Sequence, residues 1–227
     1  PPRSTLFPYT TLFRSTAAEK YPGGSTALVK STVYYPADLY TTAKWHDGSP
    51  VDDSDFVMKM ILTFDRGKPN SLLYDSVAQG YLDTFLSHFK GVRIVSTQPL
   101  VIETYDDIYQ LDAELNVVSW WPSYSTGEAP WHTLATGIRA EVANQLAFGY
   151  NKADTLQVPH TDFIGGESLP ILEMHLNAAA ASNYLPYAPV LGGYTSPAAV
   201  ASRWANLQNW FGTHGHFWVG SGPFYLS

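Results

Sequence analysis

Carboxylates are the side chains of this 227-residue sequence whose number and spacing most readily suggest chemistry. An acidic run with interspersed tyrosines begins at Glu103 and ends at Glu114. Glycoside hydrolysis needs two carboxyl groups roughly 5–10 Å apart across a sugar-binding cleft. A solvated strand end explains the run equally well, so both interpretations stay open. The residues in question are Glu103, Tyr105, Asp106, Asp107 and Tyr109.

Two other groups contain residue types that bind metal ions. Asp52, Asp53 and Asp55 are close enough in sequence to share a cation, but N-capping and the helix dipole explain carboxylates at a helix start better. His214 and His216 supply two ligands without a third at a recognisable spacing. Histidines near the C-terminal end of a helix are favoured by its dipole. We therefore expect neither a metal nor another cofactor.

Tryptophans form the densest aromatic cluster, at Trp120, Trp121 and Trp131. Most tryptophans in a globular chain fill the core, but such rings also stack on sugars, peptide side chains or a partner. Core packing is the more common role. The alternative hypothesis is that at least one of the three lines a ligand-binding cleft.

Recognisable catalytic motifs are missing from the sequence. It contains no Gly-x-Ser-x-Gly elbow, Walker loop, dinucleotide-binding glycine pattern or His-Glu-x-x-His. The lack of cysteine removes disulfides, thiol nucleophiles and Cys-ligated zinc, and fits an exported protein. The net charge of −7 argues against a nucleic-acid partner. Residues 94–227 have only three basic side chains against eleven acidic ones, which predicts a surface poor in cations.

The elements that must position these residues follow from apolar spacing and turn signals. Residues 27–35 predict a strand, and 92–96 and 100–105 predict two strands joined at Gln98-Pro99. Asp52, with Asp55 three residues later, predicts a capped helix over residues 53–66. A second helix should end before Gly91.

The remainder of the chain is predicted to be mainly helical. Leucine-rich periodicities indicate helices around residues 134–146 and 169–181. Ser196 and Pro197 mark the start of a third, stopped by Gly212 or Gly215. Residues 217–219 and 224–226 resemble short strands. The expected fold class is α/β, or mixed α+β.

The N-terminus is treated separately. Residues 5–15 resemble the translation of a common sequencing adapter, so we expect residues 1–26 to be an artefact or linker. Residues 27–227 are then expected to form a partial domain, incomplete at one or both ends. No signal peptide is recognisable, and no apolar stretch approaches the roughly 18 residues of a membrane span.

Two segments carry a family resemblance. Residues 44–57 (KWHDGSPVDDSDFV) resemble the signature of extracytoplasmic solute-binding proteins of peptide-type ABC importers. Asp52 stands where that family usually has Thr, and both are good N-caps. Residues 214–226 (HGHFWVGSGPFYL) are similar to the family's Gly-x-Gly-Pro-Tyr element, with Phe224 in the aromatic place. The matching residues are Trp45, Asp47, Gly48, Pro50, Asp55, Phe56, Gly220, Gly222 and Pro223.

The resemblance implies a substrate-binding component without covalent chemistry. The family fold is a two-lobed clamshell that captures peptides or similar solutes and delivers them to a membrane permease. It would work in the periplasm or outside the cell, associated with the membrane. The matching residues would then be structural: a tight turn at Asp47-Gly48, a cap at Asp52 and a bend at Gly220 and Gly222.

Two alternatives to this reading remain. The acidic and aromatic content suggests an exported carbohydrate-active enzyme or glycan-binding module. The sequence is also compatible with a truncated product that has no function of its own.

Overall fold

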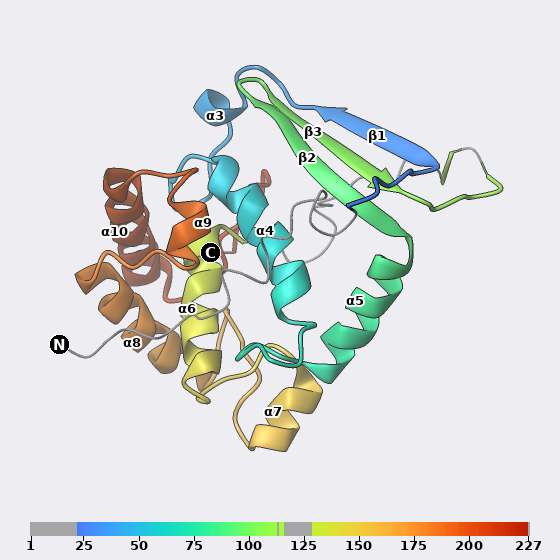
Figure 1. The fold of residues 1–227 in the computed structure, drawn as a ribbon. Coiled ribbons are helices and arrows are strands. Elements are labelled where there is room, and N and C mark those ends of the chain that lie inside the picture. The colour runs from blue at the N-terminus through green and yellow to red at the C-terminus, as the bar shows by residue number, and fades with distance from the viewer. Residues whose placement is uncertain (1–21, 113, 116–128, 227) are drawn as a thin grey trace.

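The computed structural model describes residues 22–112, 114–115 and 129–226. The elements are β1 (Val29–Tyr34), α3 (Leu39–Thr42), α4 (Asp53–Asp65), α5 (Ser76–His88), β2 (Phe89–Thr97), β3 (Leu100–Asp106), α6 (Trp131–Val142), α7 (Tyr150–Leu156), α8 (Ser168–Ala181), α9 (Ala188–Leu191) and α10 (Pro197–His214). The three strands lie in the first part of the chain together with α3, α4 and α5, and the later elements are all helices, as Figure 1 shows. The fold is mixed α and β, as predicted.

The sheet has three antiparallel strands in the order β1-β3-β2. Its central strand alternates buried and half-buried residues, so that Leu100, Ile102 and Thr104 face the interior. The predicted hairpin is confirmed, although β2 is longer than expected at its start. Figure 1 shows α4 between this sheet and α6.

Helix α4 begins as its sequence predicts. Asp52 is the N-cap, its side chain accepts a hydrogen bond from Ser54 N, and Asp55 completes a capping box. The buried face carries Phe56, Val57, Met58, Met60 and Ile61. This face belongs to the same apolar cluster as Ile102 of the sheet and Ile138 of α6, so α4 fixes the position of the capped loop that precedes it.

Helices α6, α8 and α10 form the helical layer. Their apolar stripes meet in one cluster that also includes side chains from α4 and β3. Ser196 caps α10 through Ala199 N, and Gly215 ends it with a left-handed backbone (φ +71°). Both ends of α10 therefore fall where the sequence predicts. No helix among the described residues is long and apolar enough to cross a membrane.

The predicted strands at residues 217–219 and 224–226 are wrong. Phe217 and Val219 are buried and Trp218 is half exposed, which is the alternation that made the segment resemble a strand. The segment has no ladder partner among the described residues, and Phe217 N donates a single bond to Phe163 O at 2.7 Å. The short helices α7 and α9 were not predicted, since neither starts with a capping side chain.

Candidate functional site

The loop before α4 is a small hairpin. Lys44 and Pro50 form an antiparallel bridge, and Trp45 N donates to Ser49 O at 2.8 Å. Gly48 has φ +87°, in the region that favours glycine. The tight turn predicted at Asp47-Gly48 is confirmed, and it directs the Asp47 side chain inward.

The Asp47 carboxylate is fully buried and paired with a histidine. It accepts hydrogen bonds from His132 Nε2 at 2.7 Å and from Ser49 N at 2.9 Å. Burial alone would raise the pKa of Asp47, but the bond from His132 and the bonds from Ser49 lower it below its ordinary value. Asp47 therefore remains a carboxylate inside the protein.

His132 is buried completely, and burial lowers its pKa despite the neighbouring Asp47. Its Nδ1 faces Arg203 Nη1 at 3.3 Å, and a guanidinium can only donate. Nδ1 is therefore the acceptor and Nε2–H donates to Asp47. The ring is held as a neutral imidazole with both nitrogens in use.

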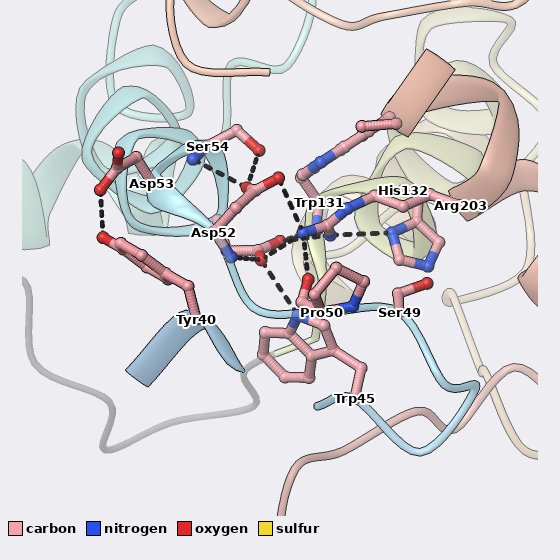
Figure 2. Close-up of polar contacts among 12 residues, drawn as sticks. Tyr40, Trp45, Ser49, Pro50, Asp52, Asp53, Ser54, Trp131, His132 and Arg203 are labelled. Carbon is pink, nitrogen blue, oxygen red and sulfur yellow. Dashed lines mark hydrogen bonds and ion pairs between the residues drawn. The ribbon is translucent and has the colours of Figure 1, made fainter. Parts of the chain in front are cut away.

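Asp55 is the centre of the buried cluster, and its partners Trp45, Trp131 and Arg203 are labelled in Figure 2. Its two oxygens accept from five donors: Trp45 Nε1 at 3.0 Å, Asp52 N and Trp131 N at 3.1 Å, and Arg203 Nη1 and Nη2 at 2.9 and 2.8 Å. This forked pairing with arginine is the strong form of a salt bridge. It joins the start of α4, the start of α6 and the middle of α10.

Arg203 also holds the hairpin itself. Its Nη2 donates to Pro50 O at 2.6 Å and lies 3.1 Å from Asp52 Oδ2. The side chain is 1% exposed, so these contacts are shielded from water and salt. The motif carboxylates Asp47, Asp52 and Asp55 thus bind side chains of the helical layer.

The arrangement lacks the geometry of a catalytic triad. Ser49 Oγ donates to Asp47 rather than to His132, and the second nitrogen of His132 faces Arg203. Ser49, Asp47 and His132 are therefore each bonded to another group of the protein. Asp53, the remaining candidate cation ligand, accepts from the Tyr40 hydroxyl. The described residues contain no group of three His, Cys, Asp or Glu arranged to hold a metal ion. The bonds of this cluster join the hairpin and the start of α4 to α6 and α10.

The two motif segments, far apart in sequence, meet at His46. His46 N donates to Gly220 O at 2.8 Å, and its ring contacts Gly220 N at 3.2 Å and Gly222 O at 2.8 Å. A Cβ at Gly220 would lie 3.1 Å from the imidazole, so this close approach favours glycine. Gly222 has open space around its Cα, and its backbone has no left-handed φ. The structure therefore gives a steric reason for glycine at position 220 but none at position 222. Pro223 lies in the exposed stretch that follows.

The tryptophans fall in different places. Trp120 and Trp121 lie outside the described residues, and their ligand-binding role stays a prediction. Trp131 has no exposed surface and packs edge-on against Trp204 at 5.6 Å between ring centroids. Its position matches the core interpretation of the cluster, because a fully buried indole has no face open to a solute.

The acidic run does not gather its carboxylates. Glu103 pairs with Lys30 at 3.1 Å on one face of β3. Asp106 is buried on the opposite face, since side chains three residues apart in a strand point in opposite directions. Asp107 pairs with Lys90 at 2.8 Å. Glu103 and Asp106 are therefore not placed to flank one glycosidic bond.

Arg203 and His132 are the important residues that the motifs did not indicate. A signal for Arg203 exists in the sequence: it lies three residues after Val200 and four before Leu207, on the apolar stripe of α10. A charge on such a stripe requires a buried counter-charge. His132 has no comparable signal.

Two surface hollows lie away from the cluster. One, of about 590 Å³, is lined by residues between 153 and 168. The other, of about 620 Å³, is lined by residues between 22 and 27, by residues 90–93 and by Tyr105 of the acidic run. Neither is lined by residues 44–57 or 214–226. No protein-family model matches the chain, and no curated protein matches its sequence.

Proposed function

We propose that the chain is the substrate-binding component of an ABC import system, or a piece of it. It captures peptides or similar solutes in the periplasm or outside the cell and passes them to a membrane permease. A two-lobed clamshell and membrane association are parts of the same proposal.

The observation that carries the proposal is the meeting of the two motif segments at His46. The resemblance rests on residues 44–57 and 214–226, which are separated by more than 150 residues. Three hydrogen bonds join them, two to Gly220 and one to Gly222. Chance resemblances in two unrelated segments have no reason to pack against each other, whereas two parts of one family signature do.

The buried cluster supports a binding role in a second way. Asp47, Asp55, His132 and Arg203 are shielded from solvent and bonded to one another. They shape the hairpin and fix helices, which suits a scaffold that moves a solute without changing it. The glycan-enzyme alternative gains no comparable support, because Glu103 and Asp107 are each paired with a lysine.

Thermal melting of the 227-residue chain with two ligand classes, together with a sugar-release assay, tests the proposal. We expect an oligopeptide pool to raise the melting temperature in a concentration-dependent way, because a ligand that binds only the native state stabilises it. A panel of sugars should have no effect, and incubation with polysaccharides should release no sugar. Sugar release, or stabilisation by sugars alone, would instead favour the alternative.

Asp52→Ala provides the matched control for this assay. We expect it to lower the melting temperature of the free chain and leave the peptide-induced rise intact, since Asp52 binds Ser54 and Arg203 within the protein. Loss of the peptide effect without loss of stability would assign Asp52 to the ligand site. The genomic reading frame is an independent check: an export signal upstream and adjoining permease genes are expected.

A further inference from the structure

His46 is held by two backbone groups that fix its tautomer. Gly220 N lies 3.2 Å from His46 Nδ1, and a backbone N–H can only donate. Gly222 O lies 2.8 Å from His46 Nε2, and a carbonyl can only accept. The ring must therefore be neutral, with its proton on Nε2.

His216 repeats the same arrangement ten residues before the end of the described segment. Trp218 N donates to His216 Nδ1 at 3.1 Å, and Leu226 O lies 3.2 Å from His216 Nε2. His216 is 5% exposed and also requires the neutral Nε2–H form. His216 thus closes residues 216–226 into a loop, and His46 anchors the middle of that loop to the hairpin.

The surroundings of the two rings contain no charge that compensates a proton. Trp210 packs against both, with centroids 6.1 Å from His46 and 5.6 Å from His216. The titratable groups that face this cluster are His214, which is 5.7 Å from His216, and Tyr225, which is 5.9 Å from His46. Among the described residues, neither His46 nor His216 has an Asp or Glu oxygen within 4 Å.

On the hairpin that carries His46, the nearest charged residues also leave the imidazole uncompensated. Asp47 directs its carboxylate to Ser49 and His132, and Lys44 is exposed. Protonation of Nδ1 in either ring would place an N–H against a backbone N–H and remove an acceptor. Protonation of His46, His214 and His216 together would add like charges around Trp210.

We propose that His46 and His216 form an acid-released latch that holds residues 216–226 against the body of the protein at neutral pH. A proton on either Nδ1 removes the acceptor of a backbone N–H, so acid breaks the two bonds that hold the latch. This segment contains the Gly-Ser-Gly-Pro element, and its release changes how that element meets the hairpin. The inference rests on the hydrogen bonds alone and is independent of the transport proposal.

Nitrogen-15 NMR of the imidazoles in the unmodified chain tests the premise directly. At about pH 7.5 both rings should carry their proton on Nε2 and leave Nδ1 bare. A ring with its proton on Nδ1, or a doubly protonated ring at that pH, would overturn the proposal.

Hydrogen exchange at two amides tests the release. The Trp218 and Gly220 amides donate to the two Nδ1 atoms. After correction for intrinsic exchange, their protection should fall about tenfold between pH 7.5 and 5, as expected when a hydrogen bond is lost. The Val200 amide, bonded to Ser196 O within α10, should keep its protection and is the internal reference. Equal protection of Trp218 and Gly220 at both pH values would contradict the latch.

A double substitution separates titration from simple loss of contacts. His46→Asn with His216→Asn keeps a side-chain oxygen acceptor near each Nδ1 position but cannot be protonated. We expect its amide protection to become independent of pH. His160→Asn, which removes a histidine bonded to Phe148 O elsewhere, should retain the pH dependence of the parent chain. The same pH dependence in the double variant would refute the assignment.

Discussion

Individual residues in this protein are constrained by neighbours that the sequence does not reveal. Gly149 shows this most sharply, because a Cβ added there would overlap the Asp75 carboxylate. Asp75 has no freedom to move away: it caps α5 through Val77 N at 2.8 Å and lies 3.6 Å from Arg66. The identity of Gly149 is therefore set by a contact across 74 positions of sequence, which no local pattern predicts.

Gly149→Ala should destabilise the protein by about 1–3 kcal/mol, the usual cost of overpacking. Gly80→Ala is the matched control, because Gly80 lies inside α5 with open space around its Cα. That change should stabilise the protein by up to about 1 kcal/mol, since alanine favours helix more than glycine. Urea unfolding of both variants measures the change in the free energy of unfolding, which should be negative for Gly149→Ala and positive for Gly80→Ala. Equal effects would contradict the overlap between Gly149 and Asp75.

His132 makes the free energy of unfolding depend on pH, in a direction that follows from its pKa shift. Burial lowers its pKa in the folded protein below the ordinary value of 6.5. Below that pH the unfolded chain binds a proton that the folded chain excludes, so the free energy of unfolding falls as pH falls. One histidine that stays neutral costs up to about 1.4 kcal/mol per pH unit in this range.

His132→Gln tests this contribution, because the glutamine amide can still donate to Asp47 but cannot titrate. Urea unfolding at several values between about pH 7.5 and pH 5 should show a shallower loss of stability in the variant than in the parent. Other histidines are common to both proteins and cancel in the comparison. Parallel pH profiles would mean that His132 is protonated in the folded state.

At the scale of elements, helix α4 shows how much the sequence can predict. Its capping box is local information, since Asp52, Ser54 and Asp55 lie within four residues. The ion pair between Asp52 and Arg203, at 3.1 Å, is long-range information and was not predicted. The wrong strand prediction for residues 217–219 has the same origin. Their apolar alternation is local information, whereas a strand also needs a pairing partner from elsewhere in the chain.

Asp52→Ala should cost about 1 kcal/mol, and at most about 2, through loss of the α4 cap. Asp52→Ser keeps a capping oxygen and loses the contact with Arg203, so it should be less destabilising than the alanine variant. Ser196→Ala removes the corresponding cap of α10 and gives a reference without an ion pair. Unfolding free energies of the three variants measure the effects. An alanine variant as stable as the parent would show that the cap is not needed.

At the scale of the whole molecule, the few cations of the second part of the chain are turned inward. Arg203 is 1% exposed, the Lys152 side chain is 14% exposed and bonds Glu141, and Arg139 lies over the Tyr184 ring at 4.6 Å. Several carboxylates of the same region are exposed. The charge count of the sequence predicts this cation-poor surface, but only the structure shows which acidic partners bury the cations.

The Asp55–Arg203 pair joins α4 to α10 across 148 positions of sequence, and a double-mutant cycle measures how strongly it does so. Removing one member of a buried pair leaves an uncompensated charge, so Asp55→Asn and Arg203→Met should each cost about 3–5 kcal/mol. The double variant should cost less than the sum of the two by more than about 1 kcal/mol, because the second change removes the charge that the first left unpaired.

The exposed Lys30–Glu103 pair on the sheet is the control for this cycle, and its coupling should be much weaker because water and salt screen it. The cycle also distinguishes three accounts of how α4 and the helical layer are held together. Strong coupling with a single cooperative unfolding transition in every variant would mean that the pair reinforces one continuous core. Coupling near zero would mean that apolar packing alone holds α4 against α6 and α10, and that the shape of the hairpin does not depend on Arg203. A separate early transition in the single variants would place the boundary between two unfolding units at this pair.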